Sequence, residues 1–93
     1  MPELKDTAKM MCSGDYKERF KAEYLQTKYR YEKLKKFNDT IEAAERTRYH
    51  HNIESVPEPA HDCPIELLRQ QQHAMGEYLH TLELRAIIEN IEL

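Results

Sequence analysis

Apolar residues recur at steps of three, four or seven between residues 16 and 48, and this segment contains neither Gly nor Pro. The recurring positions are Phe20, Tyr24, Tyr31, Leu34 and Ile41, flanked by Leu25, Phe37 and Ala44, with the polar Thr27 and Asn38 filling gaps. Such a stripe, with charges opposite, is typical of an amphipathic helix. Asp15, followed three residues later by Glu18, suits a helix start because its side-chain oxygen can accept from free N–H groups of the first turn. The pattern predicts a helix over about residues 15–48, about 50 Å long at 1.5 Å per residue.

A second stripe with the same spacing follows residue 62. It comprises Leu68, Gln71, Met75, Tyr78, Leu82 and Arg85, flanked by Leu67, Ala74, Leu79 and Ala86. Pro64 is preorganised for a first helical turn, and Glu66 lies favourably near the positive end of the helix dipole. The pattern predicts a second helix over about residues 63–91. We expect the two helices to pack through Phe20, Tyr24, Tyr31, Leu34 and Ile41 against Leu68, Met75, Leu79 and Leu82.

Helix-breaking residues divide the chain at two places. Residues 49–62 contain Pro57 and Pro59, each of which removes a backbone donor and restricts the residue before it. We therefore expect a loop that reverses the chain. Residues 1–14 end at Ser13-Gly14 and form an arm or a short helix. The predicted fold is all-α: a long antiparallel helical hairpin over residues 15–93, with an N-terminal arm or short helix.

Length and the apolar C-terminus predict that copies of the chain associate. Ninety-three residues make at most one domain, and two long helices bury only a thin core. The last turn carries Ile87 and Ile88, and Ile91 and Leu93 follow. One partner helix cannot cover a surface that is apolar on more than one side. We expect an oligomeric helical assembly in which these residues form contacts.

Charge is distributed unevenly along the chain. Residues 15–48 hold ten Lys or Arg and seven Asp or Glu, a net of +3, whereas residues 49–93 hold two Arg and eight acids, a net of −6. Opposite signs suit two elements that pack side by side. The whole chain has a net charge of −3, and acids interrupt the basic residues of the first half. Nucleic-acid binding is therefore not favoured.

Several classes of protein are disfavoured. No stretch approaches the roughly 20 apolar residues that span a bilayer, and the first residues lack the apolar core of a signal peptide. Cys12 and Cys63 are too few for a disulfide framework, so we expect free thiols and a cytoplasmic location. There is no Gly-rich phosphate loop, no nucleophile elbow and no paired His or Cys spacing of a zinc site. The sequence predicts neither an enzyme nor a metal or cofactor site.

Arg85 is the main candidate for ligand binding. It falls on the predicted inward stripe, where a cation requires a partner. One alternative is an ion pair with an acid of the first helix (Glu23, Glu32 or Glu42) or of a neighbouring protomer. The other is a ligand phosphate, which the Arg side chain suits. In an oligomer, pockets between subunits would be lined by Arg85, Gln71, Tyr78 and Arg69, with Arg holding phosphates and Tyr stacking on bases.

Two segments carry a resemblance to a known group of proteins. The first is Asp15-Tyr16-Lys17-Glu18-Arg19-Phe20-Lys21-Ala22-Glu23-Tyr24 with Lys33-Leu34. The second is Cys63-Pro64-Ile65-Glu66-Leu67-Leu68, followed by Gln71, Ala74-Met75, Tyr78-Leu79, Leu82-Glu83, Arg85-Ala86 and Ile91-Glu92-Leu93. Together they resemble a family of small proteins of crAss-like and other bacteriophages and prophages. The resemblance implies a phage protein acting in the cytoplasm of an infected bacterial host. In architecture, the chain is also similar to phage helical hairpins that assemble as sponges for cyclic-nucleotide signals of bacterial immunity, and Arg85-Ala86 is similar to an Arg-Ala near the end of those hairpins.

These observations leave three functional hypotheses. The leading one is a counter-defence protein that sequesters a cyclic nucleotide immune signal as a homo-oligomeric sponge. The alternative is an inhibitor that binds a bacterial defence protein, of the anti-CRISPR type, using the acidic C-terminal half as an electrostatic lure for a basic groove. The third is a structural or regulatory phage protein.

Overall fold

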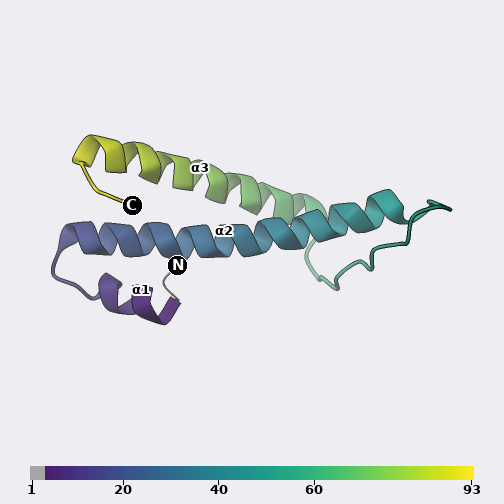
Figure 1. Ribbon diagram of the computed structural model, residues 1–93, viewed down its shortest axis with the longest axis horizontal. Helices are drawn as coiled ribbons and strands as arrows, with labels where there is room; N and C mark the ends of the chain where they lie inside the picture. The colour runs from purple at the N-terminus through teal and green to yellow at the C-terminus, as the bar shows by residue number, and fades with distance from the viewer. Residues whose placement is uncertain (1–3) are drawn as a thin grey trace.

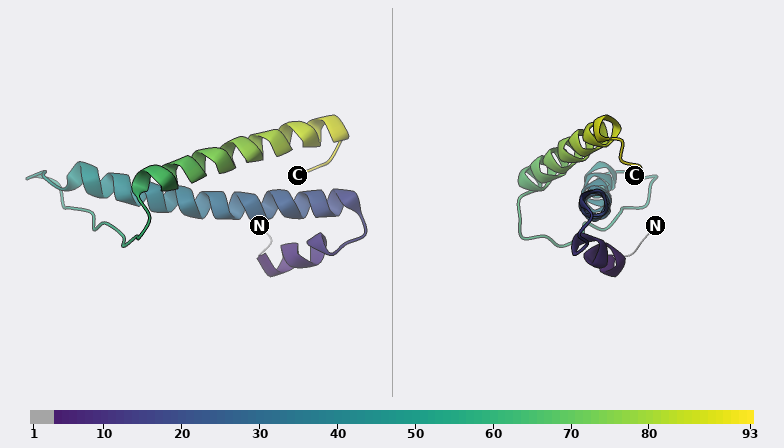
Figure 2. Two further views of the ribbon diagram at one scale, coloured as in Figure 1. Left: turned by 180° about the vertical axis from the view of Figure 1, so that it is seen from behind. Right: turned by 90° about the vertical axis from the view of Figure 1, so that its left-hand side faces the viewer.

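The computed structural model describes residues 4–93, and every regular element in that range is a helix. The helices are α1 (Leu4–Met11), α2 (Tyr16–Thr47) and α3 (Ile65–Glu89). The long α2 is central: α1 folds back beside its N-terminal half, and α3 returns along it in the antiparallel sense (Figure 1). An end-on view places α1 and α3 on different sides of α2 (Figure 2). The predicted all-α hairpin is confirmed.

Hydrogen bonds in residues 13–19 define the start of α2. The Asp15 carboxylate accepts from the backbone N–H of Lys17 at 3.1 Å, as expected of an N-terminal cap. The Ser13 hydroxyl accepts from the Asp15 N–H at 3.1 Å and donates to the Glu18 carboxylate. Arg19 donates to the Ser13 carbonyl at 2.7 Å. These bonds fix the turn that sends α1 back along α2.

The ends of the other segments are held in a similar way. The Thr47 hydroxyl donates to the Ala43 carbonyl at 2.8 Å and accepts from the Val56 N–H at 3.0 Å, which ties the loop back onto α2. After α3, Asn90 adopts the left-handed conformation with φ of 56°. The Ile91 N–H then donates to the Ala86 carbonyl at 2.8 Å. This is the geometry of a helix C-terminus closed by a left-handed residue, and it returns the chain toward the core.

The main core lies where the start of α2 meets the end of α3. It is a cluster of buried residues: Phe20, Tyr24, Leu79, Leu82, Ala86 and Ile91. Ile41 and Ala44 are also buried, near the other end of α2. Of the predicted contact residues, Phe20, Tyr24, Ile41, Leu79 and Leu82 are buried as expected, whereas Tyr31, Leu34, Leu68 and Met75 are only half-buried.

The buried face of α3 differs from the predicted one. Gln71, Tyr78 and Arg85 are exposed, and the residues that follow each of them turn inward instead: Gln72, Leu79 and Ala86. Both rows keep steps of three and four from Leu68, Met75 and Leu82, so spacing alone does not separate them. Packing selects the second row because Leu79 and Ala86 can be buried without the desolvation cost of a guanidinium. The prediction that Arg85 lies on the inward stripe is therefore wrong: its side chain is 49% exposed.

The apolar C-terminus divides into a covered and an uncovered part. Ile91 is only 6% exposed and packs in the chain's own core, so the expectation that it serves a contact with another copy is wrong. Ile87 and Ile88 remain 78% and 81% exposed. Despite these residues, none of the helices in residues 4–93 has the length and apolar character needed to cross a membrane.

Candidate functional site

Arg85 lies in a cluster of side chains at the start of α2 and the end of α3. Its Nε donates to Glu89 Oε2 at 3.0 Å, one turn further along α3. A terminal nitrogen donates to the Tyr16 hydroxyl at 2.6 Å, and the guanidinium lies 5.1 Å from the centre of the Phe20 ring. We call Tyr16, Phe20, Arg85 and Glu89 the Arg85 cluster. The partner of Arg85 is thus an acid of its own helix, and not Glu23, Glu32 or Glu42 of the first helix.

Electrostatics within the Arg85 cluster follow from one shared hydrogen bond. The Tyr16 hydroxyl donates to Glu89 Oε1 at 2.8 Å. This bond holds the pKa of the Glu89 carboxyl below its ordinary value, with a further contribution from Arg85. The same bond raises the pKa of the Tyr16 phenol. Glu89 therefore stays ionised and neutralises part of the charge of Arg85, while half of the guanidinium side chain remains open to solvent.

Tyr78 and Gln71 continue a row along α3 that ends at Arg85. The three are seven residues apart, so each lies about 10 Å from the next at 1.5 Å per residue. Tyr78 is 43% exposed, and its hydroxyl donates to Glu23 Oε1 at 2.9 Å. That bond raises the pKa of the Tyr78 phenol. The row thus presents a carboxamide, a half-exposed ring and a guanidinium on one side of the helix.

Arg69 is separated from the other candidates within one chain. It precedes Arg85 by sixteen residues on the same helix, which is about 24 Å. Its guanidinium lies 3.6 Å from Glu45 Oε2 of α2, and both side chains are nearly half exposed. The structure therefore brings Tyr78 and Arg85 to one end of the hairpin and places Arg69 near the other.

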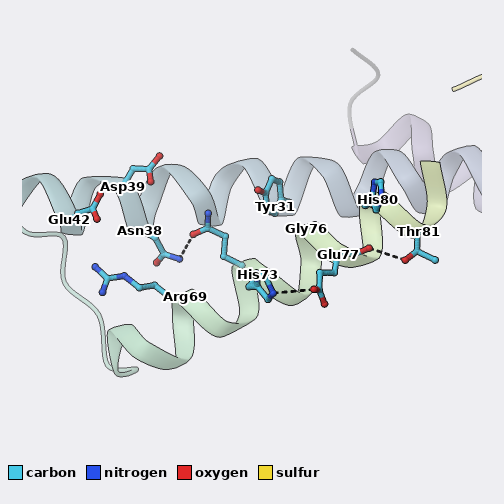
Figure 3. Close-up of a pocket in the computed structure, with 11 residues that line it drawn as sticks. Tyr31, Asn38, Asp39, Glu42, Arg69, His73, Gly76, Glu77, His80 and Thr81 are labelled. Atoms are coloured by element: carbon cyan, nitrogen blue, oxygen red, sulfur yellow. Dashed lines mark hydrogen bonds and ion pairs between the residues drawn. The ribbon is translucent and has the colours of Figure 1, made fainter. Parts of the chain in front are cut away.

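Arg69 borders an open groove between α2 and α3 with a volume of about 870 Å³ (Figure 3). Its lining residues are Tyr31, Asn38, Asp39, Glu42, Arg69, Gln72, His73, Gly76, Glu77, His80 and Thr81. Asn38 is only 3% exposed, and its Nδ2 donates to the Leu68 carbonyl at 3.2 Å and to Gln72 Oε1 at 2.9 Å. Its Oδ1 is buried and has no partner among residues 4–93. From the sequence alone, Asn38 was only a polar residue that interrupts the first apolar stripe.

The groove is not a basic site. The carboxylates of Asp39, Glu42 and Glu77 border it, against the one guanidinium of Arg69. Asp39 pairs with Lys35 at 2.7 Å, Glu42 with Arg46 at 3.6 Å, and Glu77 with His73 at 3.2 Å. These pairs leave little positive potential for a phosphate. Within the part of the chain that the structure describes, no group of three His, Cys, Asp or Glu residues could hold a metal ion.

Comparison with curated proteins and with solved structures gives no match. A family model described as Sequestin matches residues 14–88, which begin just before α2 and end in the last turn of α3. The matched segment contains α2, nearly all of α3, the row from Gln71 to Arg85 and the groove residues. Because it covers well over half of the chain, the protein belongs to the Sequestin family.

Proposed function

We propose that this protein sequesters a nucleotide immune signal of an infected bacterium, as a phage counter-defence protein that binds its ligand without turning it over. The family name suggests sequestration of a ligand. The observation that carries the proposal is the exposure of Arg85 beside Tyr78 and next to uncovered apolar residues of α3. A phosphate and a base would find complementary groups there.

The Arg85 cluster suits a phosphate because the guanidinium is charged, planar and already oriented. Arg pairs with phosphate oxygens through two parallel hydrogen bonds, which are stronger than bonds between neutral groups. Its contacts with Tyr16 and Phe20 hold the side chain in place before a ligand arrives. Tyr78 offers an aromatic surface about 10 Å away along the helix for a base.

A second copy of the chain would complete such a site. Leu84 and Ile88 are exposed on the side of α3 next to the row of Gln71, Tyr78 and Arg85. A copy that covered these apolar residues would lie directly beside Tyr78 and Arg85. Arg69 is too distant to join Arg85 within one chain, but a neighbouring copy can bring its own Arg69 close. The proposed oligomer would therefore let Arg69 of one copy line a pocket with Tyr78 and Arg85 of another.

Calorimetric titration with a panel of cyclic di- and trinucleotides tests the proposal, run beside light scattering for the mass of the assembly. We expect saturable binding by an oligomer, and its loss in Arg85→Ala with the mass unchanged. Arg46→Ala is the matched control because Arg46 is exposed and also pairs with an acid one turn away on its own helix. Ligand recovered after denaturing the complex should be chemically intact, as expected of a protein that is not an enzyme.

The opposite result favours the alternative function. A single-chain mass over a hundredfold dilution, with no heat from any nucleotide, would contradict the proposal. The uncovered Ile87 and Ile88 would then fit a contact with a bacterial defence protein.

A further inference from the structure

We propose that copies of this chain join head to tail, with the end of α3 of one copy packed on a basic face of α2 in the next. The receiving surface combines lysines with aromatic rings and is called the α2 face: Tyr29, Lys33, Lys36 and Phe37. The surface that docks on it is called the α3 patch: Glu83, Leu84, Ile87 and Ile88. This inference rests on the oligomer that the proposed function requires, and it names the surfaces that join the copies.

The α3 patch is an apolar surface that the chain's own helices leave open. Leu84 and Ile88 are one turn apart, as are Glu83 and Ile87, so the four side chains adjoin on one side of α3. Leu84, Ile87 and Ile88 are 47%, 78% and 81% exposed. Three large apolar side chains gathered at one end of a helix form a patch, which is typical of a contact surface rather than of scattered surface residues.

The α2 face lies on the side of α2 that α1 covers nearer the N-terminus. Gln26 donates to the Thr7 hydroxyl of α1 at 3.1 Å, and Lys33 follows Gln26 by seven residues, or about two turns, on the same side of the helix. Lys33 and Lys36 border a depression of about 290 Å³, to which Phe37 and Pro59 contribute apolar surface. An aliphatic side chain can therefore pack there beside two ammonium groups.

Charge determines which surfaces attract each other. Residues 28–36 hold five Lys or Arg and one Glu, a net of +4, whereas residues 65–93 hold five Glu and two Arg, a net of −3. Lys33 lies 5.3 Å from the centre of the Tyr29 ring, and neither Lys33 nor Lys36 forms an ion pair within residues 4–93. Two α3 patches would bring acidic surfaces together, whereas an α3 patch on an α2 face places Glu83 near lysines that have no acid partner.

The two surfaces cannot meet within one chain. Helices α1 and α3 lie on different sides of α2 (Figure 2), and the α2 face is on the side of α1. The contact therefore joins different surfaces of two copies, and each copy keeps one surface open for a further copy. Because each surface is only a few side chains wide, we expect an association that reverses on dilution in the micromolar range.

Two variants, each of which breaks one surface, test the proposal by light scattering and sedimentation without nucleotide. Lys33→Glu/Lys36→Glu breaks the α2 face, and Ile87→Ser/Ile88→Ser breaks the α3 patch. All four side chains are exposed, so circular dichroism should show unchanged helix content. We expect each variant alone to associate at least about tenfold more weakly than the wild type. An equimolar mixture should form dimers that grow no further, because it retains one intact α3 patch and one intact α2 face.

Lys35→Glu/Arg46→Glu is the matched control, because it makes the same change of charge on α2 at exposed positions outside the α2 face. It should associate like the wild type. A single-chain mass for the wild type over a hundredfold dilution, wild-type association by either surface variant, or a mixture without dimers would overturn the proposal. Nucleotide titration is a separate measurement. An oligomer that binds nucleotide but is insensitive to these variants would refute only the contact, whereas dimers in the mixture without any nucleotide binding would refute only the sequestration.

Discussion

The two ends of the contact between α2 and α3 are built differently. At one end, where Phe20 meets Leu82, Ala86 and Ile91, the helices are joined by apolar side chains that exclude water. At the other, around Asn38 and Gln72, they are joined by hydrogen bonds from one buried amide, and a groove opens beside it. The first arrangement supplies non-directional stability, whereas the second leaves polar atoms whose partners must be specific. The hairpin therefore has one end sealed by apolar packing and another that carries an open groove.

The largest effect should come from the apolar end. Leu82 is 2% exposed, so Leu82→Ala removes buried methyl groups and leaves a cavity. We expect the free energy of unfolding to fall by about 2–5 kcal/mol, measured by urea denaturation. Leu84→Ala, two residues along the same helix and 47% exposed, is the matched control and should change it by less than about 0.5 kcal/mol in the monomer. Similar losses in both variants would mean that the apolar end does not hold the hairpin.

The next effect concerns the turn that brings Ile91 into the apolar end. Asn90 has a positive φ, which Asn tolerates better than other residues with a side chain. Asn90→Ala should lower the free energy of unfolding by about 1 kcal/mol, the scale of the left-handed penalty, whereas Asn90→Gly should be neutral or stabilising. Glu92→Ala is the exposed neighbouring control. If Asn90→Ala were also neutral, the closing turn would contribute little to the position of Ile91.

The sequence predicts the apolar end of the hairpin better than the end that carries the groove. The spacing of apolar residues, with Pro and Gly between the segments, predicts the helices. The apolar stripes predict that Phe20, Tyr24, Leu79 and Leu82 are buried between them. The inward face of α3 was misassigned because two adjacent rows share the same spacing. The partner of Arg85 could not be predicted, since Glu89 was one of several acids within reach. The groove was missed because it depends on where one polar residue of α2, Asn38, meets one of α3.

A smaller effect is expected at the close approach within the groove. Gly inside a helix costs about 0.5–1 kcal/mol relative to Ala, so Gly76→Ala would ordinarily stabilise α3. Here the added Cβ would lie 3.3 Å from the Tyr31 ring, which must move. We therefore expect little gain in the free energy of unfolding in the wild-type background and the full gain in a Tyr31→Ala background. A double-mutant cycle by thermal denaturation measures the difference, and equal gains in both backgrounds would show that Tyr31 does not press on α3.

The smallest effect should be a change in pH dependence at the Arg85 cluster, where the guanidinium of Arg85 is half exposed. The pKa of Glu89 is lowered in the folded state, first by the Tyr16 hydrogen bond and then by Arg85. A carboxyl with a lowered folded pKa adds stability above its unfolded pKa, about 4.3 for Glu, and this contribution is lost as the pH falls through the folded value. Tyr16→Phe and Arg85→Ala should therefore each raise the pKa of Glu89 toward its ordinary value. The stability difference between each variant and the wild type should shrink as the solution is acidified below the folded pKa. Carboxyl-detected NMR titration of Glu89, with Glu66 as an exposed reference in the first turn of α3, measures the shifts. An unchanged pKa of Glu89 in Tyr16→Phe would show that the phenol does not help to keep Glu89 ionised, and an unchanged pKa in Arg85→Ala would show the same of the guanidinium.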